Sequence, residues 1–190
     1  PDDTTLRRPL AEYSNLSDYY LTYDDLFHAT SAPASLAQTR GATMTQTFCF
    51  LLLPGFSMMG LMSAIEPLRV ANRFRGDLYR WHLLSRDGAA VAASNGMSLN
   101  VDGALELVEA TEALFVVAGF DPLAHHDSRL AHWLQRCETE LKVLGGIDTG
   151  SFVLAEAGLF QQQRLTLHWE AIDAFRERYP ALQVTQELFE

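Results

Sequence analysis

Basic residues are scarce in this sequence. Its 190 residues include 14 Lys and Arg against 24 Asp and Glu, which gives a formal net charge of −10 at pH 7. Proteins that bind nucleic acid neutralise its phosphates with clustered Lys and Arg. No basic run here is longer than Arg7-Arg8. We therefore expect that this chain does not bind DNA by itself.

Long apolar runs are missing as well. The longest, residues 48–53 and 113–118, are far shorter than the roughly 20 residues that cross a bilayer. No positively charged segment with a following apolar stretch opens the chain. We expect neither a membrane span nor a secretory signal in this sequence. Cys49 and Cys137 have no CxxC or Cys/His spacing, so we expect two buried free thiols in a cytoplasmic protein.

The motifs of common cofactors are absent too. Neither a Walker lysine nor a G-x-G-x-x-G follows a predicted strand, so phosphate and dinucleotide cofactors have no support. His125, His126 and His132 lie near Asp127, but no His-x-x-x-His pair would share one helix face. We expect no metal and no cofactor.

The composition that is present, 48% hydrophobic, 11% aromatic and 20% charged residues, is that of a folded domain. Residues 1–43 differ from the rest, because Ser, Thr, Asp, Ala and Pro dominate there and no apolar period is sustained. We interpret them as an extension or linker, and residues 44–190 as the compact domain.

Strand and helix patterns alternate in the domain, which indicates a mainly parallel sheet covered on both faces. The predicted fold class is α/β, three-layered and doubly wound, and ligands of such sheets bind beyond the carboxyl ends of the strands. This directs attention to three turns, at residues 54–56, 119–121 and 145–150. The predicted strands are 47–53, 79–85, 113–118, 141–146 and 164–167, and Asn95-Gly96 predicts a hairpin. The predicted helices are 57–74, 104–110, 122–137, 149–160 and 169–179. For the helix at 122–137 we expect Asp121 as the N-cap and Pro122 as the first helical residue.

The turn at 146–150 reads Gly-Ile-Asp-Thr-Gly, the form of a strained elbow that presents its central side chain at the top of a sheet. In a hydrolase the central residue is the nucleophile, so Asp148 could form a covalent ester that His168 helps to hydrolyse. Alternatively, Asp148 simply caps the following helix. The spacing alone leaves both alternatives open.

Two further candidates are ambiguous. Glu66 lies in the middle of a predicted helix, either paired with Arg69 on an exposed face or directed toward a pocket. His168 and Trp169 follow a short strand, where they are either packed residues or partners of Asp148.

Four ordered motifs carry a family resemblance over residues 47–190. They are LPGF at 53–56, AIEPLRVAN at 64–72, DTGSFVLAEAGL at 148–159 and LHW at 167–169. This order resembles the amino-terminal ligand-sensing domain of AraC-type transcriptional regulators, in the ThiJ/PfpI, class I glutamine amidotransferase-like superfamily. The fold implied is flavodoxin-like. Within this group, the chain is similar to the branch that senses glycine betaine, carnitine and related nitrogen compounds. The segments that carry this similarity are GFSMM at 55–59, IEPL at 65–68 and GIDTG at 146–150.

The resemblance favours sensing over catalysis. In enzymes that this chain resembles, a reactive Cys stands at the position of Asp148 and an acidic residue on the first helix at the position of Ser63. Because neither the reactive Cys nor the acidic residue is present, the resemblance implies a domain without enzymatic activity, in which His168 does not act as a general base. A hydrolase or lyase that uses Asp148 and His168 is the alternative.

The resemblance also implies a pocket for a small zwitterion. Backbone amides of Asp148 and Thr149 and of the Gly119-Phe120 turn would accept a ligand carboxylate. Carboxylates and aromatic faces would receive a cationic head. The predicted ligand-binding residues are Phe56, Glu66, Gly119, Phe120, Asp148, Thr149, His168 and Trp169.

Regulators of this type continue into a helix-turn-helix domain that binds DNA. We therefore expect this chain to be a C-terminally truncated sensing domain without that part, and to reach DNA only through it. The expected partners are a small-molecule effector and a second copy in a homodimer, with no membrane.

Overall fold

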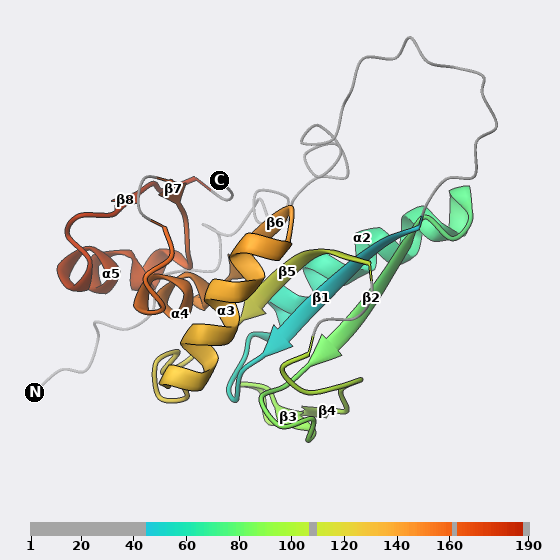
Figure 1. Ribbon diagram of the computed structural model, residues 1–190, viewed down its shortest axis with the longest axis horizontal. Coiled ribbons are helices and arrows are strands. Elements are labelled where there is room, and N and C mark those ends of the chain that lie inside the picture. The colour runs from blue at the N-terminus through green and yellow to red at the C-terminus, as the bar shows by residue number, and fades with distance from the viewer. Residues whose placement is uncertain (1–44, 107–109, 161–162, 188–190) are drawn as a thin grey trace, which may run out of the picture. The chain divides into compact units, whose positions relative to one another are not determined.

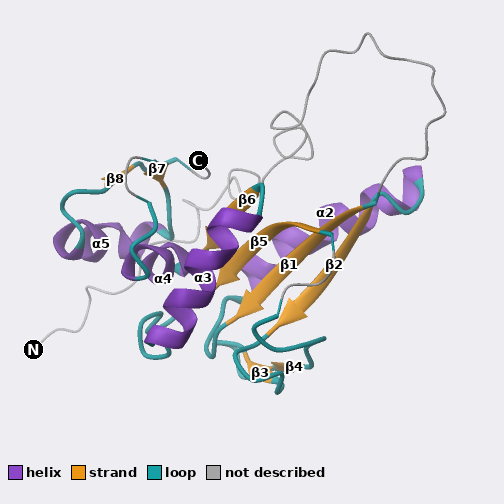
Figure 2. Ribbon diagram, viewed as in Figure 1, coloured by secondary structure: helices purple, strands orange, loops and turns teal. Residues whose placement is uncertain are grey.

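The computed structural model describes residues 45–106, 110–160 and 163–187 (Figure 1). The predicted extension at 1–43 lies outside the described residues. Four parallel strands form the central sheet in the order β2-β1-β5-β6, which confirms the predicted α/β class (Figure 2). Their bounds are β1 Gln46–Leu52, β2 Tyr79–Leu84, β5 Thr111–Val117 and β6 Val143–Ile147.

Strand β1 is buried on both faces, and its side chains alternate between two cores. Cys49 and Leu51 belong to one hydrophobic cluster, whereas Phe50 and Leu52 belong to another. Helix α2 (Met58–Arg75) covers the second cluster, and α3 (Ser128–Glu140) and α4 (Gly150–Glu156) cover the first. Figure 1 shows α2 and α3 on opposite sides of the sheet, so the predicted three layers are confirmed.

The chain reverses direction across the sheet between β1 and β5. From β1 it passes through α2 to β2 on one side, and later enters β5 on the other side of β1. Such a switch point opens a crevice at the carboxyl ends of the two strands. The turns that follow β1, β5 and β6 therefore gather at one edge of the sheet.

Helix α3 corrects the sequence-based prediction. We expected it to begin at Pro122 behind an Asp121 cap, but it begins at Ser128 with Asp127 as its N-cap. The Asp127 carboxylate accepts a hydrogen bond from the amide of Leu130 (2.9 Å) and also pairs with Arg86. Asp121 has φ +49°, whereas an N-cap residue is usually extended. Residues 121–126 form turns instead of a helix.

The smaller elements lie at the ends of the sheet. β3 (Val91–Ala92) and β4 (Ser98–Leu99) form the predicted antiparallel hairpin. Of the predicted helix 104–110, residues 104–106 are not helical and 107–109 lie outside the described residues. No helix in the described part of the chain is long and apolar enough to cross a membrane.

The C-terminal elements have a core of their own. Helix α4 ends at Glu156, four residues before the predicted end. A 3-10 helix, η3 (Trp169–Ala171), runs into α5 (Ile172–Arg178), and β7 (Arg164–Leu165) pairs with β8 (Gln183–Val184). Their core contains Phe152, Ala155, Leu165, Leu167, Ile172 and Phe175, none of them from the four central strands.

Two glycines allow the backbones at the sheet edge to touch. A Cβ atom on Gly150 would lie 2.0 Å from the carbonyl oxygen of Val116, and one on Gly119 would lie 2.3 Å from that of Gly55. Both atoms in the way are backbone oxygens, which cannot rotate aside as a side chain can. Any residue other than glycine would push α4 away from β5, or the β5 turn away from the β1 turn.

Gly150→Ala should therefore lower the free energy of unfolding by about 3 kcal/mol, the upper end of the usual cost of overpacking. Urea denaturation followed by circular dichroism measures this. Gly103→Ala is the matched control, because its Cβ would meet only Leu84 Cδ2 at an ordinary 3.6 Å. Equal stability of the two variants would contradict the close approach of α4 and β5.

Candidate functional site: the elbow cavity

Asp148 lies at a sharp turn between β6 and α4. Its φ is +60°, the left-handed region that Asp and Asn tolerate better than other non-glycine residues. Helix α4 begins two residues later, at Gly150. A Cβ atom on Gly146 would lie 2.5 Å from the amide nitrogen of Ser151, so the chain folds back tightly onto itself. This is the geometry that the G-x-D-x-G pattern predicts.

Hydrogen bonds join the elbow to the neighbouring turns. The Thr149 hydroxyl donates to the Gly119 carbonyl (2.6 Å). The Ser57 amide donates to the Ala118 carbonyl (3.1 Å), and the His168 amide donates to the Asp148 carbonyl (3.2 Å). The segments after β1, β5, β6 and β7 are thus linked to one another by hydrogen bonds.

A cavity of about 620 Å³ opens between these segments. Its walls are the elbow and first turn of α4, the irregular segment after β5, and the start of η3 and α5. The lining residues are Ser57, Ser94, Gly119, Phe120, Asp121, Pro122, Leu123, Ala124, Asp148, Thr149, Phe152, His168, Glu170, Ala171 and Ala174.

The charged residues that line the cavity are mainly acidic. Asp121, Asp148 and Glu170 contribute carboxylates, His168 contributes an imidazole, and no Lys or Arg is among the lining residues that the structure describes. Phe120 also lines the cavity and is 76% exposed. An acidic, partly aromatic cavity suits a positively charged group.

Five of the eight predicted ligand-binding residues line this cavity: Gly119, Phe120, Asp148, Thr149 and His168. They come from three separate segments, and each follows the carboxyl end of a strand. Their role in binding stays a prediction, but the structure brings them together at one site.

Glu66 does not face the cavity, contrary to our expectation. Its carboxylate pairs with Arg69, at 2.6 Å from Nη2, on the exposed side of α2. The hydrogen bond from Arg69 lowers the pKa of Glu66. The surface pair, one of the two alternatives from the sequence, is therefore the arrangement observed.

Phe56 and Trp169 are also absent from the lining. Phe56 is fully buried in the core beneath α2. Trp169 is 69% exposed, with its ring centroid 5.8 Å from that of His168. Trp169 thus contacts a cavity residue without lining the cavity itself.

The residue of α2 that lies beside the elbow is Gly60, whereas the resemblance implied Ser63. Ser63 is exposed and is not a lining residue. Gly60 faces the strand that leads into the elbow, because a Cβ atom there would lie 2.9 Å from Ile147 Cγ2. The helix position beside the elbow therefore has no side chain.

Sequence reasoning missed ten lining residues, including two acidic ones. Asp121 was assigned to a helix cap, which concealed its place in the wall. Glu170 directly follows His168-Trp169, so its position after a predicted strand was the available signal. The others are Ser57, Ser94, Pro122, Leu123, Ala124, Phe152, Ala171 and Ala174.

Both cysteines lie elsewhere, and both are free and buried, as expected. Cys49 is in β1 and Cys137 in α3, within the core beneath α3. Burial raises the pKa of the Cys137 thiol to about 12, which keeps it protonated and unreactive at neutral pH. Among the described residues no group of three or more His, Cys, Asp or Glu side chains could hold a metal ion.

A family model described as the DJ-1/PfpI family matches residues 46–186. The chain belongs to this family. The described DJ-1/PfpI domain thus contains the whole elbow cavity, since the lining residues run from Ser57 to Ala174.

Several curated relatives of this DJ-1/PfpI domain are named as transcriptional regulators. The HTH-type transcriptional regulator CdhR of Pseudomonas aeruginosa is 65% identical over 147 residues, which are 77% of this chain and 44% of CdhR. The HTH-type transcriptional regulator GbdR of the same species is 36% identical over 84% of this chain and 43% of GbdR. The chain therefore spans less than half the length of each regulator.

Solved structures agree with this assignment. An AraC family transcriptional regulator from Pseudomonas putida superposes with a TM-score of 0.66 at 28% identity, over 76% of this chain and 78% of that one. Drosophila melanogaster DJ-1beta shares the fold, with a TM-score of 0.63 at 19% identity over 76% of this chain and 75% of that one.

The elbow geometry predicts how Asp148 responds to substitution. Asp148→Asn should leave the free energy of unfolding unchanged, because Asn tolerates the left-handed region as Asp does. Asp148→Ala should lower it by about 1 kcal/mol, because Ala has the same Cβ but lacks the short polar side chain whose local hydrogen bonds let Asp and Asn adopt the left-handed region. Urea denaturation of both variants measures the difference. An Ala variant as stable as the Asn variant would contradict a fixed left-handed elbow.

Proposed function

We propose that this chain is the ligand-sensing domain of an AraC-type transcriptional regulator and that it has no catalytic activity. The relatives supply the regulatory context, and the cavity supplies a site for an effector. DNA would be bound by a helix-turn-helix domain outside this sequence. The regulator would be a cytoplasmic homodimer. The effector would act by binding one arrangement of the regulator more tightly than another.

The observation that carries the proposal is the side chain at the elbow. A covalent enzyme of this superfamily needs a thiolate at that position, and this chain has Asp148 there. Cys49 and Cys137 are 0% and 1% exposed and neither lines the cavity. Gly60, beside the elbow on α2, offers no carboxyl group to activate a nucleophile.

The chemistry of the walls favours a small zwitterionic nitrogen compound of the betaine, carnitine or amino-acid type. Three carboxylates and the Phe120 ring would receive its cationic head. The amides of Asp148 and Thr149 and the Gly119-Phe120 turn would receive its carboxylate. The volume of about 620 Å³ is in the range of small-molecule sites, roughly 300–1,000 Å³.

The second candidate is a hydrolase or lyase that uses Asp148 and His168. One observation favours it: both residues line the same cavity, and the His168 amide is hydrogen-bonded to the Asp148 carbonyl. The two candidates differ in what they predict for turnover.

Isothermal calorimetry with glycine betaine, carnitine and arginine tests the sensing proposal. We expect saturable binding of at least one of them, with the affinity lowered about tenfold or more in Asp148→Asn, because a lost charge contact of about 1.4 kcal/mol is a factor of ten. Asp173→Asn is the matched control, since this carboxylate on α5 is fully exposed and outside the lining.

Assays with esters, amides and glyoxals separate the two candidates. Turnover that disappears in both Asp148→Asn and His168→Ala would replace the sensing proposal with the enzymatic one. Absence of heat with all three compounds would reject the proposed ligand class.

A further inference from the structure

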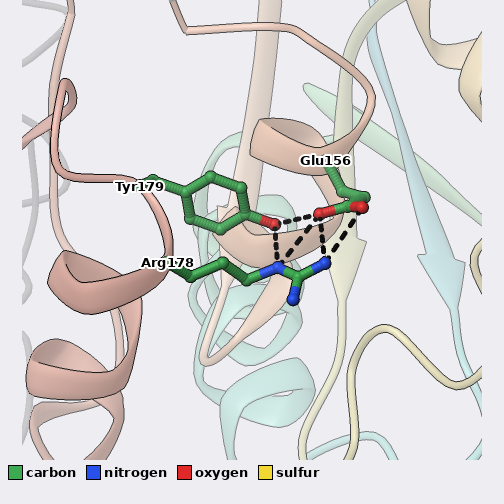
Figure 3. Close-up of polar contacts among 3 residues, drawn as sticks. All are labelled: Glu156, Arg178 and Tyr179. Atoms are coloured by element: carbon green, nitrogen blue, oxygen red, sulfur yellow. Dashed lines mark hydrogen bonds and ion pairs between the residues drawn. The ribbon is translucent and has the colours of Figure 1, made fainter.

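Three side chains join the far ends of α4 and α5 (Figure 3). Glu156 is the last residue of α4, Arg178 is the last residue of α5, and Tyr179 follows it. Nη2 of Arg178 donates to both carboxylate oxygens of Glu156, at 3.1 and 2.9 Å. The Tyr179 hydroxyl donates to the same carboxylate and accepts a hydrogen bond from Nε of Arg178 at 3.1 Å.

Every pair among the three residues is therefore in contact, and the charges suit the arrangement. The hydrogen bonds from Tyr179 and Arg178 lower the pKa of the Glu156 carboxyl. Burial and the hydrogen bond to Glu156 raise the pKa of Tyr179 to about 12. At neutral pH the carboxylate is thus ionised and the phenol protonated, which is the state that these hydrogen bonds require.

The elements joined by these contacts are also two walls of the cavity. Asp148, Thr149 and Phe152 line it from the elbow and α4, whereas Glu170 and Ala174 line it from η3 and α5. Glu156 lies seven positions after Thr149, about 10 Å along a helix that rises 1.5 Å per residue. The contacts and the cavity thus lie at opposite ends of the same pair of helices.

Aromatic packing connects the two ends. The Phe152 ring, in the cavity wall, lies 4.8 Å from the Phe175 ring and 6.1 Å from the Tyr179 ring, centroid to centroid. The Phe175 and Tyr179 rings are also 4.8 Å apart. The core that contains Phe152 and Phe175 takes no residue from the central strands, so the position of α5 depends on its contacts with α4 and the short strands.

From these observations we propose that Glu156, Arg178 and Tyr179 are positioning residues, which set the separation of the α4 and α5 walls and hence the fit of the ligand. We call them the α4–α5 clamp. The inference rests on the proposed function, because it assigns a role in binding at the same cavity. None of the three touches the ligand site; they act through Phe152 and Phe175.

Hydrogen exchange without ligand is the first test. In Tyr179→Phe, which keeps the ring but removes the hydroxyl, and in Glu156→Gln, we expect amide exchange in η3 and α5 to be at least threefold faster than in the unmodified chain. Exchange in β1 and β5 should stay unchanged. An increase by the same factor in all elements would show a purely structural role and overturn the proposal.

Glu112→Gln is the matched control. Its carboxylate is paired with Lys142 at 3.2 Å, and its side chain is 29% exposed against 30% for Glu156. It lies at the start of β5, at the opposite end of the strand from the elbow. This variant should leave exchange in η3 and α5 unaltered; an increase equal to that of Glu156→Gln would contradict a specific clamp.

Calorimetry with glycine betaine is the second test. If the unmodified chain binds it, we expect Tyr179→Phe and Glu156→Gln to bind at least threefold more weakly. Arg178→Lys should have an intermediate affinity, because Lys keeps the positive charge but lacks the planar guanidinium group that donates to both carboxylate oxygens. Unaltered affinity in all three variants overturns the proposal. If the unmodified chain does not bind it, that ligand fails while hydrogen exchange still decides on the clamp.

Discussion

The elbow cavity depends on contact between backbones, which only glycine permits. Gly150 brings α4 against β5, and Gly119 brings the β5 turn against the β1 turn. Each contact leaves no room for a single carbon atom. The hydrogen bond from the Thr149 hydroxyl to the Gly119 carbonyl then joins the elbow after β6 to the turn after β5. The positions of the turns that line the cavity after β5 and β6 therefore follow from the sheet, and the lining side chains set the chemistry of the cavity.

Much of the fold could be predicted from the sequence, because its local signals agree with one another. The continuous apolar run at 47–53 becomes the doubly buried β1, and Ser57 caps α2 through the amide of Gly60. The start of α3 could not be predicted in this way. Asp121 and Asp127 are both plausible caps, and the choice depends on the tertiary pair of Asp127 with Arg86 and on the backbone of Asp121.

The site was predictable to the extent that it follows strand ends. Sheet topology places the turns after β5 and β6 together, so four of the lining residues could be located from the sequence: Gly119, Phe120, Asp148 and Thr149. Glu66 could not, since the sequence does not indicate which face of α2 meets the cavity. The place of Glu170 in the wall could not be predicted for a similar reason: it depends on how η3 packs, which is decided by a core that joins α4 to residues 165–175.

The DJ-1/PfpI fold separates the framework of this site from its chemistry. The sharp turn at residue 148 and the close backbone contacts at Gly119 and Gly150 belong to the framework, which accommodates an aspartate in the left-handed region. The thiols that the chain does have are in the core, where they pack as small apolar groups. The chemistry of the described cavity is set by the three carboxylates in its walls.

The late start of α3 has a consequence for the evolution of this site. Because Asp127 caps the helix, residues 121–126 are released from helical geometry while both of their ends stay anchored, by β5 and by the cap. Insertions and substitutions in that segment can reshape the cavity mouth without disturbing the helix or the sheet. The composition of this part of the cavity wall can thus vary while the sheet and α3 keep their structure.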